Sequence, residues 1–103
     1  MKKMFRLLFI LTLLPTIAFS QKDQTTYTSM DEALKNPDRV LRLDLSDQNI
    51  DFSWETLRQF VNIEYLSLRD DHLENFPMEI LELEKLKVLD LSGNDFSELP
   101  DDF

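Results

Sequence analysis

Apolar residues follow one uneven spacing that returns along the second half of the chain. The stretch LKVLDLSGND, which begins at Leu86, has leucines three and then two residues apart before the pattern stops at an asparagine. This spacing fits neither an amphipathic helix nor a strand with one buried face throughout. The same spacing begins at Val40 and at Ile63, so the starts are 23 residues apart both times. The period predicts stacked repeats over residues 40–62, 63–85 and 86–103, the last of them incomplete.

Superposing the repeats places the apolar residues in columns. The columns are Val40, Ile63, Leu86; Leu43, Leu66, Leu89; Leu45, Leu68, Leu91; and Ile50, Leu73, Phe96. We expect one short strand per repeat, whose alternate residues face a shared core, followed by a compact, helix-like return path. Pro77 and Pro100 suit the first position of such a helix, and Ser53 can cap it in the first repeat.

With these columns in place, residues 40–103 resemble the leucine-rich repeat family, whose typical 23-residue class reads LxxLxLxxNxLxxLPxxIxxLxxL. The resemblance implies an α/β fold: a leucine-rich repeat solenoid with a short parallel sheet, helical or irregular return segments and a concave sheet face that binds other proteins. It also suggests a secreted bacterial type.

The turn column departs from the family pattern. It reads Gln48, Asp71, Asn94, so only the third repeat has the family's asparagine. Asparagine can both donate and accept hydrogen bonds with backbone groups that would otherwise be buried unpaired. An ionised Asp71 cannot donate, and Gln48 is one methylene longer. We therefore expect a weakened ladder of turn hydrogen bonds, at about 1 kcal/mol for each lost bond.

The first twenty residues have the pattern of a signal peptide. A basic start precedes an apolar run, Leu7 to Phe19, that is too short to span a bilayer. Small residues at Ala18 and Ser20 predict cleavage before Gln21, with export and no stable membrane insertion afterwards. An uncleaved anchor is the alternative.

Residues 21–28 are polar, and we expect a flexible linker there. Residues 29–39 predict one short helix, because Ser29 and Glu32 match a capping box and the Asn36-Pro37 pair ends it. The apolar side of this helix consists of Met30, Ala33 and Leu34. The helix suits an N-terminal cap over the apolar end of the first repeat.

Charge and composition exclude several kinds of site. The chain has 11 basic and 20 acidic residues; without residues 1–20, 8 basic residues remain against 20 acidic ones, a net charge of −12. Such a balance argues against nucleic-acid binding. The chain has no cysteine and a single histidine, His72, so we expect no cofactor and no transition-metal site. Asp47 and Asp70 share a column and have the oxygens that calcium prefers, although we favour a solvated acidic rim as the explanation.

The outward side of the strands is the candidate binding site. Its columns are Arg42, Tyr65, Val88; then Asp44, Ser67, Asp90; then Ser46, Arg69, Ser92. Arginine and tyrosine are enriched in protein interfaces, so this face favours an unknown protein or peptide as the partner. Cross-strand pairing among the charged residues, without any ligand, is the alternative.

The expected function is non-catalytic protein or peptide binding outside the cytoplasm. Two alternatives remain open: a repeat segment that selects the substrate of a larger enzyme truncated after residue 103, and a structural spacer. The sequence stops in mid-repeat at Phe103. We expect more repeats to follow, or a truncated product, while a complete three-strand minidomain is the alternative.

Overall fold

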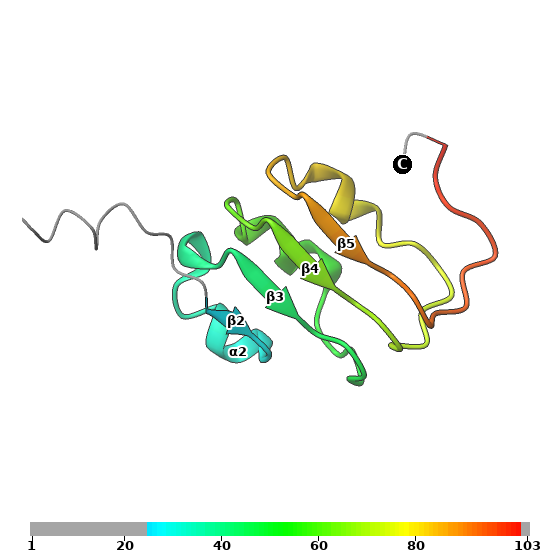
Figure 1. The fold of residues 1–103 in the computed structure, drawn as a ribbon, viewed down its shortest axis with the longest axis horizontal. Coiled ribbons are helices and arrows are strands. Elements are labelled where there is room, and N and C mark those ends of the chain that lie inside the picture. Colours follow the sequence, from blue (N-terminus) through cyan, green and yellow to red (C-terminus); the bar gives the residue numbers. More distant parts are fainter. Residues whose placement is uncertain (1–24, 102–103) are drawn as a thin grey trace, which may run out of the picture.

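The strands of the repeats form one parallel sheet. The computed structural model describes residues 25–101, so the expected signal peptide and the first part of the linker lie outside the described residues. The sheet has the order β2-β3-β4-β5, with β2 at Thr26–Tyr27, β3 at Arg42–Asp44, β4 at Tyr65–Ser67 and β5 at Val88–Asp90 (Figure 1). Helical turns follow the first three strands. After β2 come α2 (Met30–Ala33) and the 3-10 helix η1 (Pro37–Arg39); β3 is followed by η2 (Trp54–Gln59) and β4 by η3 (Met78–Glu82).

The register of the sheet confirms the 23-residue alignment. Leu43 pairs with Leu66 and Leu66 with Leu89 across the three repeat strands. A shift by one residue would turn every leucine of a strand to the other face, so this register is strongly specified. The residues before and after each leucine therefore lie together on the opposite face of the sheet.

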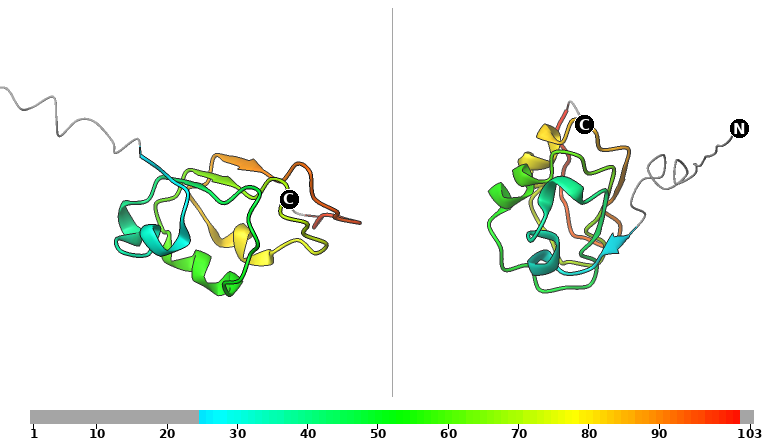
Figure 2. Two further views of the ribbon diagram at one scale, coloured as in Figure 1. Left: turned by 90° about the horizontal axis from the view of Figure 1, so that it is seen from below. Right: turned by 90° about the vertical axis from the view of Figure 1, so that its left-hand side faces the viewer.

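The core lies between the sheet and the return segments. Figure 2 shows the strands along one side of the molecule and the helices η2 and η3 on the other. The leucines of β3 and β4 are fully buried against residues of η2 and η3 such as Leu57 and Ile80. Leu89 and Leu91, at the last strand, are only partly buried. The core thus thins towards β5.

The return segments are 3-10 helices, and their starts differ from the sequence expectation. Pro77 precedes η3 as its N-cap residue instead of occupying the first helical position. Ser53 takes the N-cap position of η2, but its side chain makes no capping hydrogen bond. These helices begin in extended backbone and close with bonds between residues three apart, such as the one from Thr56 N to Ser53 O.

The expected helix over residues 29–39 is broken in two. The α-helix α2 ends at Ala33, and η1 begins at Pro37 after Asn36, whose φ of −147° and ψ of 71° are not helical. Proline restricts the residue before it and has no N–H to continue the helix. Half of the expected capping box is present, because the Ser29 hydroxyl accepts from the Glu32 amide at 3.3 Å. The Glu32 carboxylate instead accepts from Lys35 Nζ at 3.0 Å.

The flexible linker expected up to residue 28 is wrong at residues 26 and 27. They form β2, which pairs in parallel with β3 through Thr26 opposite Arg42 and Tyr27 opposite Leu43. Threonine and tyrosine both favour strands, and pairing satisfies backbone groups that the edge of β3 would otherwise leave open.

One turn position adopts a left-handed backbone in every repeat. Asp47 and Asp70 have φ angles of 54° and 57°, and Gly93, the chain's only glycine, has 73° in the same column. Aspartate tolerates this conformation better than most residues, and glycine adopts it freely. A Cβ on Gly93 would collide with the Oδ1 atom of Asp70, so a side chain there would require Asp70 to move.

Candidate binding face

Three parallel strands present their outward side chains on one surface, which we call the open face. It consists of Arg42, Asp44, Ser46, Tyr65, Ser67, Arg69, Val88, Asp90 and Ser92. The register places Tyr65 between Arg42 and Val88, and Ser67 between Asp44 and Asp90. Neighbouring strands are about 4.8 Å apart, so these side chains form a continuous surface. The outward residues that the sequence predicts are therefore brought together.

Arg42 is held in place on this face by two contacts. Its guanidinium carbon lies 4.2 Å from the centre of the Tyr65 ring, a cation–π arrangement. Its Nε donates to the Thr26 hydroxyl at 3.0 Å. Within residues 25–101 no hydrogen bond occupies its two terminal nitrogens. The side chain is thus positioned while its terminal donors stay available to a partner.

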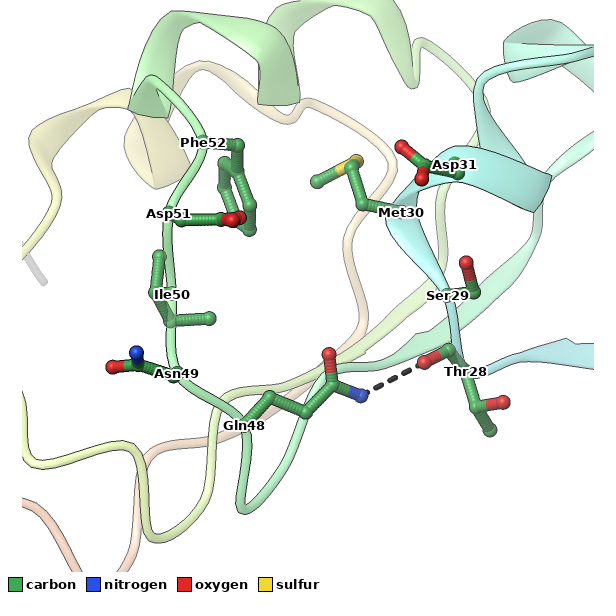
Figure 3. Close-up of a pocket in the computed structure, with 9 residues that line it drawn as sticks. All are labelled: Thr28, Ser29, Met30, Asp31, Gln48, Asn49, Ile50, Asp51 and Phe52. Carbon is green, nitrogen blue, oxygen red and sulfur yellow. Dashed lines mark hydrogen bonds between the residues drawn. The ribbon is translucent and has the colours of Figure 1, made fainter.

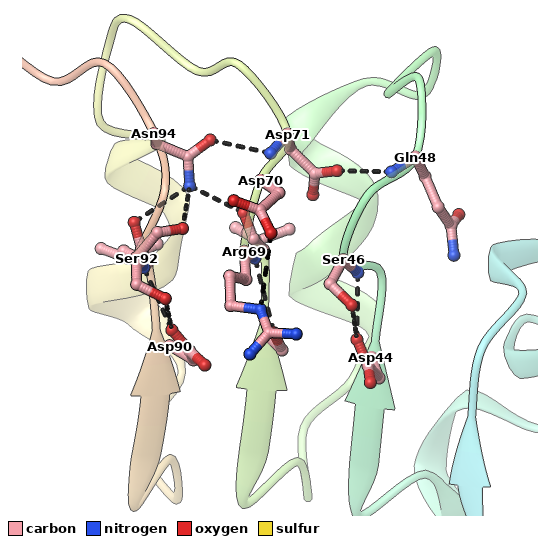
Figure 4. A network of polar contacts seen from close by, with 12 residues as sticks. Asp44, Ser46, Gln48, Arg69, Asp70, Asp71, Asp90, Ser92 and Asn94 are labelled. Carbon is pink, nitrogen blue, oxygen red and sulfur yellow. Dashed lines mark hydrogen bonds and ion pairs between the residues drawn. The ribbon is translucent and has the colours of Figure 1, made fainter.

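Asp44 and Asp90 are held by serines two residues further along. Asp44 Oδ1 accepts from Ser46 N at 3.0 Å and from Ser46 Oγ at 2.6 Å. Asp90 makes the same two bonds with Ser92 (Figure 4). The hydroxyl and amide of Ser92 lower the pKa of Asp90 because both stabilise its ionised form. The open face therefore has two fixed negative charges beside its two arginines.

The remaining residues of the face differ in what they can touch. Ser67 is 3% exposed, so it forms the floor of the face and is not available to a partner. Val88 is 51% exposed and presents an apolar side chain next to Tyr65. Arg69 is exposed, and its Nε lies 3.7 Å from Asp70 Oδ2. At that distance and exposure the ion pair is weak, which leaves Arg69 free to reorient.

The turn column joins the repeats at the end of the strands (Figure 4). Asn94 Oδ1 accepts from Asp71 N at 3.0 Å, and Asp71 Oδ1 accepts from Gln48 N at 2.7 Å. The side chain of Gln48 leaves this line, and its Nε2 donates to Thr28 O at 2.8 Å. The ladder therefore runs from the third repeat to the N-terminal segment, with a different side chain at each step.

A hollow of about 270 Å³ separates the N-terminal segment from the first turn (Figure 3). Its walls are residues 28–31 on one side and residues 48–52 on the other. The hydrogen bond from Gln48 to Thr28 crosses between the two walls. The side chain of Met30 points from α2 toward the hollow. The hollow has no cluster of charged groups, and we assign it no chemistry.

Sequence reasoning missed the contribution of Thr26. This residue precedes the first repeat, so the 23-residue period has no column for it. Its strand pairing and its bond to Arg42 extend the open face by one strand. The alternation of residues with high strand propensity in TTYT was the available signal.

Residues 25–101 contain neither a cluster of metal-ligating side chains nor a membrane-spanning helix. That part of the chain has no group of three or more histidine, cysteine, aspartate or glutamate residues placed to hold a metal ion. His72 is exposed on the turn after Asp71. In the same range, no helix has the length and apolar character that crossing a membrane requires.

The chain is similar to known repeat proteins. A family model described as Leucine Rich Repeat matches residues 85–103. Among solved structures, a leucine-rich repeat protein of Leptospira interrogans is similar, with a TM-score of 0.53 and 28% sequence identity. The match covers 76% of this chain and 26% of the solved chain, so this chain spans about a quarter of that protein's length.

Proposed function

The chain is a leucine-rich repeat protein, and from that premise we propose that it is an exported, non-catalytic protein that binds a protein or peptide through the open face. The observation that carries this proposal is Arg42, which is stacked on Tyr65 and bonded to Thr26, while no hydrogen bond within residues 25–101 occupies its terminal donors. Because the Arg42 side chain is already ordered, less conformational entropy is lost when a partner binds.

The chemistry of the open face indicates what the partner presents. Arg42 and Arg69 can donate to carboxylates or to main-chain carbonyl oxygens, and arginine does so in a planar, two-pronged geometry. Asp44 and Asp90 would repel an acidic group that lies between the arginines. Val88 and the Tyr65 ring offer apolar contact. We therefore expect a peptide segment with separated acidic groups and an apolar side chain near its centre.

The proposal includes a solenoid whose first repeat is covered by the N-terminal segment. Ala33 is fully buried, and Met30 and Leu34 pack against the core. The strand β2 also covers the edge of β3. These contacts support a cap, because the first repeat of a stack needs its apolar end covered.

Binding is tested by substitution once a partner has been identified by crosslinking to the purified protein. Tyr65→Ala should weaken binding by about 1–3 kcal/mol, as removal of a central aromatic anchor does. The double variant Arg42→Ala, Arg69→Ala should also weaken it. Calorimetry measures both, with His72→Ala as the control off the face. Parental affinity in both variants would show that the open face is not the site.

Export is tested separately. The basic start and the short apolar run of residues 1–20 motivate cleavage between Ser20 and Gln21. We expect the intact mass of the protein from the medium or the cell envelope to begin at Gln21. A product that retains Met1 and stays in the membrane would contradict the export part of the proposal and leave the binding part standing.

A further inference from the structure

The same turn position is filled by an amide in one repeat and by an acid in the repeat before it. Asn94 Nδ2 donates to the main-chain oxygens of Leu68, at 2.8 Å, and of Leu91, at 3.0 Å. Its Oδ1 accepts from the amides of Asp71 and Leu73. The asparagine thus uses both ends of its side chain to join the second and third repeats.

Asp71 makes only one of the four corresponding bonds between the first and second repeats. Its Oδ1 accepts from Gln48 N at 2.7 Å, which repeats the role of Asn94 Oδ1. Its Oδ2 takes the position of the donating nitrogen, and that oxygen is buried without a hydrogen-bond partner. Asp71 as a whole is only 6% exposed, so this oxygen lies in the interior, where most polar atoms have a hydrogen-bond partner.

A main-chain oxygen is available to complete the pair. One repeat before Leu68 and Leu91, the corresponding residues are Leu45 and Leu68. Leu45 is fully buried, and within residues 25–101 no hydrogen bond ends on its carbonyl oxygen. Two acceptors would then face each other without a hydrogen, and each would be left unsatisfied in the interior.

The charges around Asp71 are unfavourable to a carboxylate. Burial, and the negative charges of Asp47, Asp44 and Asp70, raise the pKa of Asp71, while the Gln48 amide opposes them. From the third repeat the contacting group is the neutral carboxamide of Asn94, next to Asp95. The cation Arg69, two residues away, is exposed and lies 3.7 Å from Asp70, and His72 is exposed on the same turn.

We propose that Asp71 is protonated in the folded protein under acidic conditions and donates from Oδ2 to the main-chain oxygen of Leu45. The contact between the first two repeats then gains a donor bond that corresponds to the one from Asn94 Nδ2 to Leu68 O. Loss of the proton at higher pH leaves a buried carboxylate facing a carbonyl. The contact between the first and second repeats is therefore pH-sensitive, whereas the contact between the second and third is not. This difference does not depend on any partner of the open face.

The direction of the pH effect follows from linkage. The folded protein holds the Asp71 proton more tightly than the unfolded chain does, since its pKa is raised in the fold. The stabilisation is complete below the pKa of an aspartate in the unfolded chain, about 4, and is lost as pH rises through the pKa of Asp71 in the folded protein. Above that pH the ionised side chain keeps its bond from Gln48 N but lacks the proposed donor bond.

Asp71→Asn in the full 103-residue chain tests this directly. The amide supplies a permanent donor, so the variant should be more stable than the parent at neutral pH. We expect its unfolding equilibrium constant to fall about tenfold there. The difference should shrink as pH falls toward 4. Urea unfolding across that pH range measures it, and the carboxyl carbon signal of Asp71 in NMR reports the proton itself.

Two further variants keep the test decisive. Asn94→Asp places an acid in the contact between the second and third repeats, so it should lower stability at neutral pH and introduce a new pH dependence. Asp70→Asn removes an exposed carboxylate from the same turn and should change the pH dependence only slightly. The proposal is overturned if Asp71→Asn is less stable than the parent at neutral pH, or if it keeps the parental pH dependence.

A cation on the carboxylate is the competing account. In that case calcium chloride should raise the neutral-pH stability of the parent and have no effect on Asp71→Asn. That result would also overturn the proposal, because it requires Asp71 to be ionised. Equal responses of the two proteins to calcium, together with the pH behaviour above, support a protonated Asp71.

Discussion

The two faces of the repeat strands obey different rules. On the inner face the registered residues Leu43, Leu66 and Leu89 are the same in every repeat. On the open face the neighbouring row changes from arginine to tyrosine to valine at each step. A shared core requires residues of the same shape in successive repeats, whereas a recognition surface needs variety. Repetition therefore identifies the residues that fold the protein, and its interruption identifies candidates for binding.

The largest loss of stability is expected when a charge is placed on the inner face of the strands. Leu66 is fully buried in the central repeat strand. Leu66→Asp should abolish folding, because the new carboxylate is buried without a partner. Circular dichroism should show no cooperative thermal transition. Cooperative melting near the parental midpoint would mean that Leu66 does not belong to the core.

A smaller loss is expected at the turn beyond the strands. Gly93→Ala forces a side chain into a backbone with φ of 73° and against the carboxylate of Asp70. The left-handed conformation alone costs about 1–2 kcal/mol for a residue with a Cβ. Urea unfolding measures the loss, and Ser97→Ala, at an exposed site, is the control. Unchanged stability of Gly93→Ala would show that the third turn can adopt another conformation.

The smallest effect is expected from an acid on the open face. The bonds from Ser92 lower the pKa of Asp90 in the folded protein. The contribution of Asp90 to stability is present above the pKa of an aspartate in the unfolded chain, about 4. It is lost as pH falls through the lower pKa of Asp90 in the folded protein. Asp90→Asn should therefore lose slightly less stability on acidification than the parent. Identical acid unfolding curves would indicate that the contact with Ser92 does not persist in solution.

The sequence predicted those parts of the fold that depend on repetition. The 23-residue period set the register of β3, β4 and β5 and assigned the buried leucines correctly. It failed where a residue belongs to no repeat: Thr26 and Tyr27 form a strand because the edge of β3 needs a pair. The Asn36-Pro37 pair was expected to end the N-terminal helix, but α2 already ends at Ala33 and Pro37 begins the separate helix η1.

The candidate site was predicted in outline but not in its contacts. Alternation along each strand indicated which side chains face outward. It did not show that Ser67 is buried between its neighbours, because exposure depends on the size of the side chains on adjacent strands. The link from Arg42 to Thr26 also depends on a strand that the period does not include. Side-chain contacts across strands therefore require the three-dimensional structure.

The central claim is that adjacent residues of one strand have separate roles, Leu66 in folding and Tyr65 in binding. The most direct measurement is the free energy of unfolding of Leu66→Ala and Tyr65→Ala, compared in the same urea titration. Leu66→Ala should lose about 2–5 kcal/mol, as buried leucines do. Tyr65→Ala should lose about 1 kcal/mol or less, mainly its contact with Arg42. A loss for Tyr65→Ala as large as that for Leu66→Ala would contradict the account, since the open face would then be part of the core.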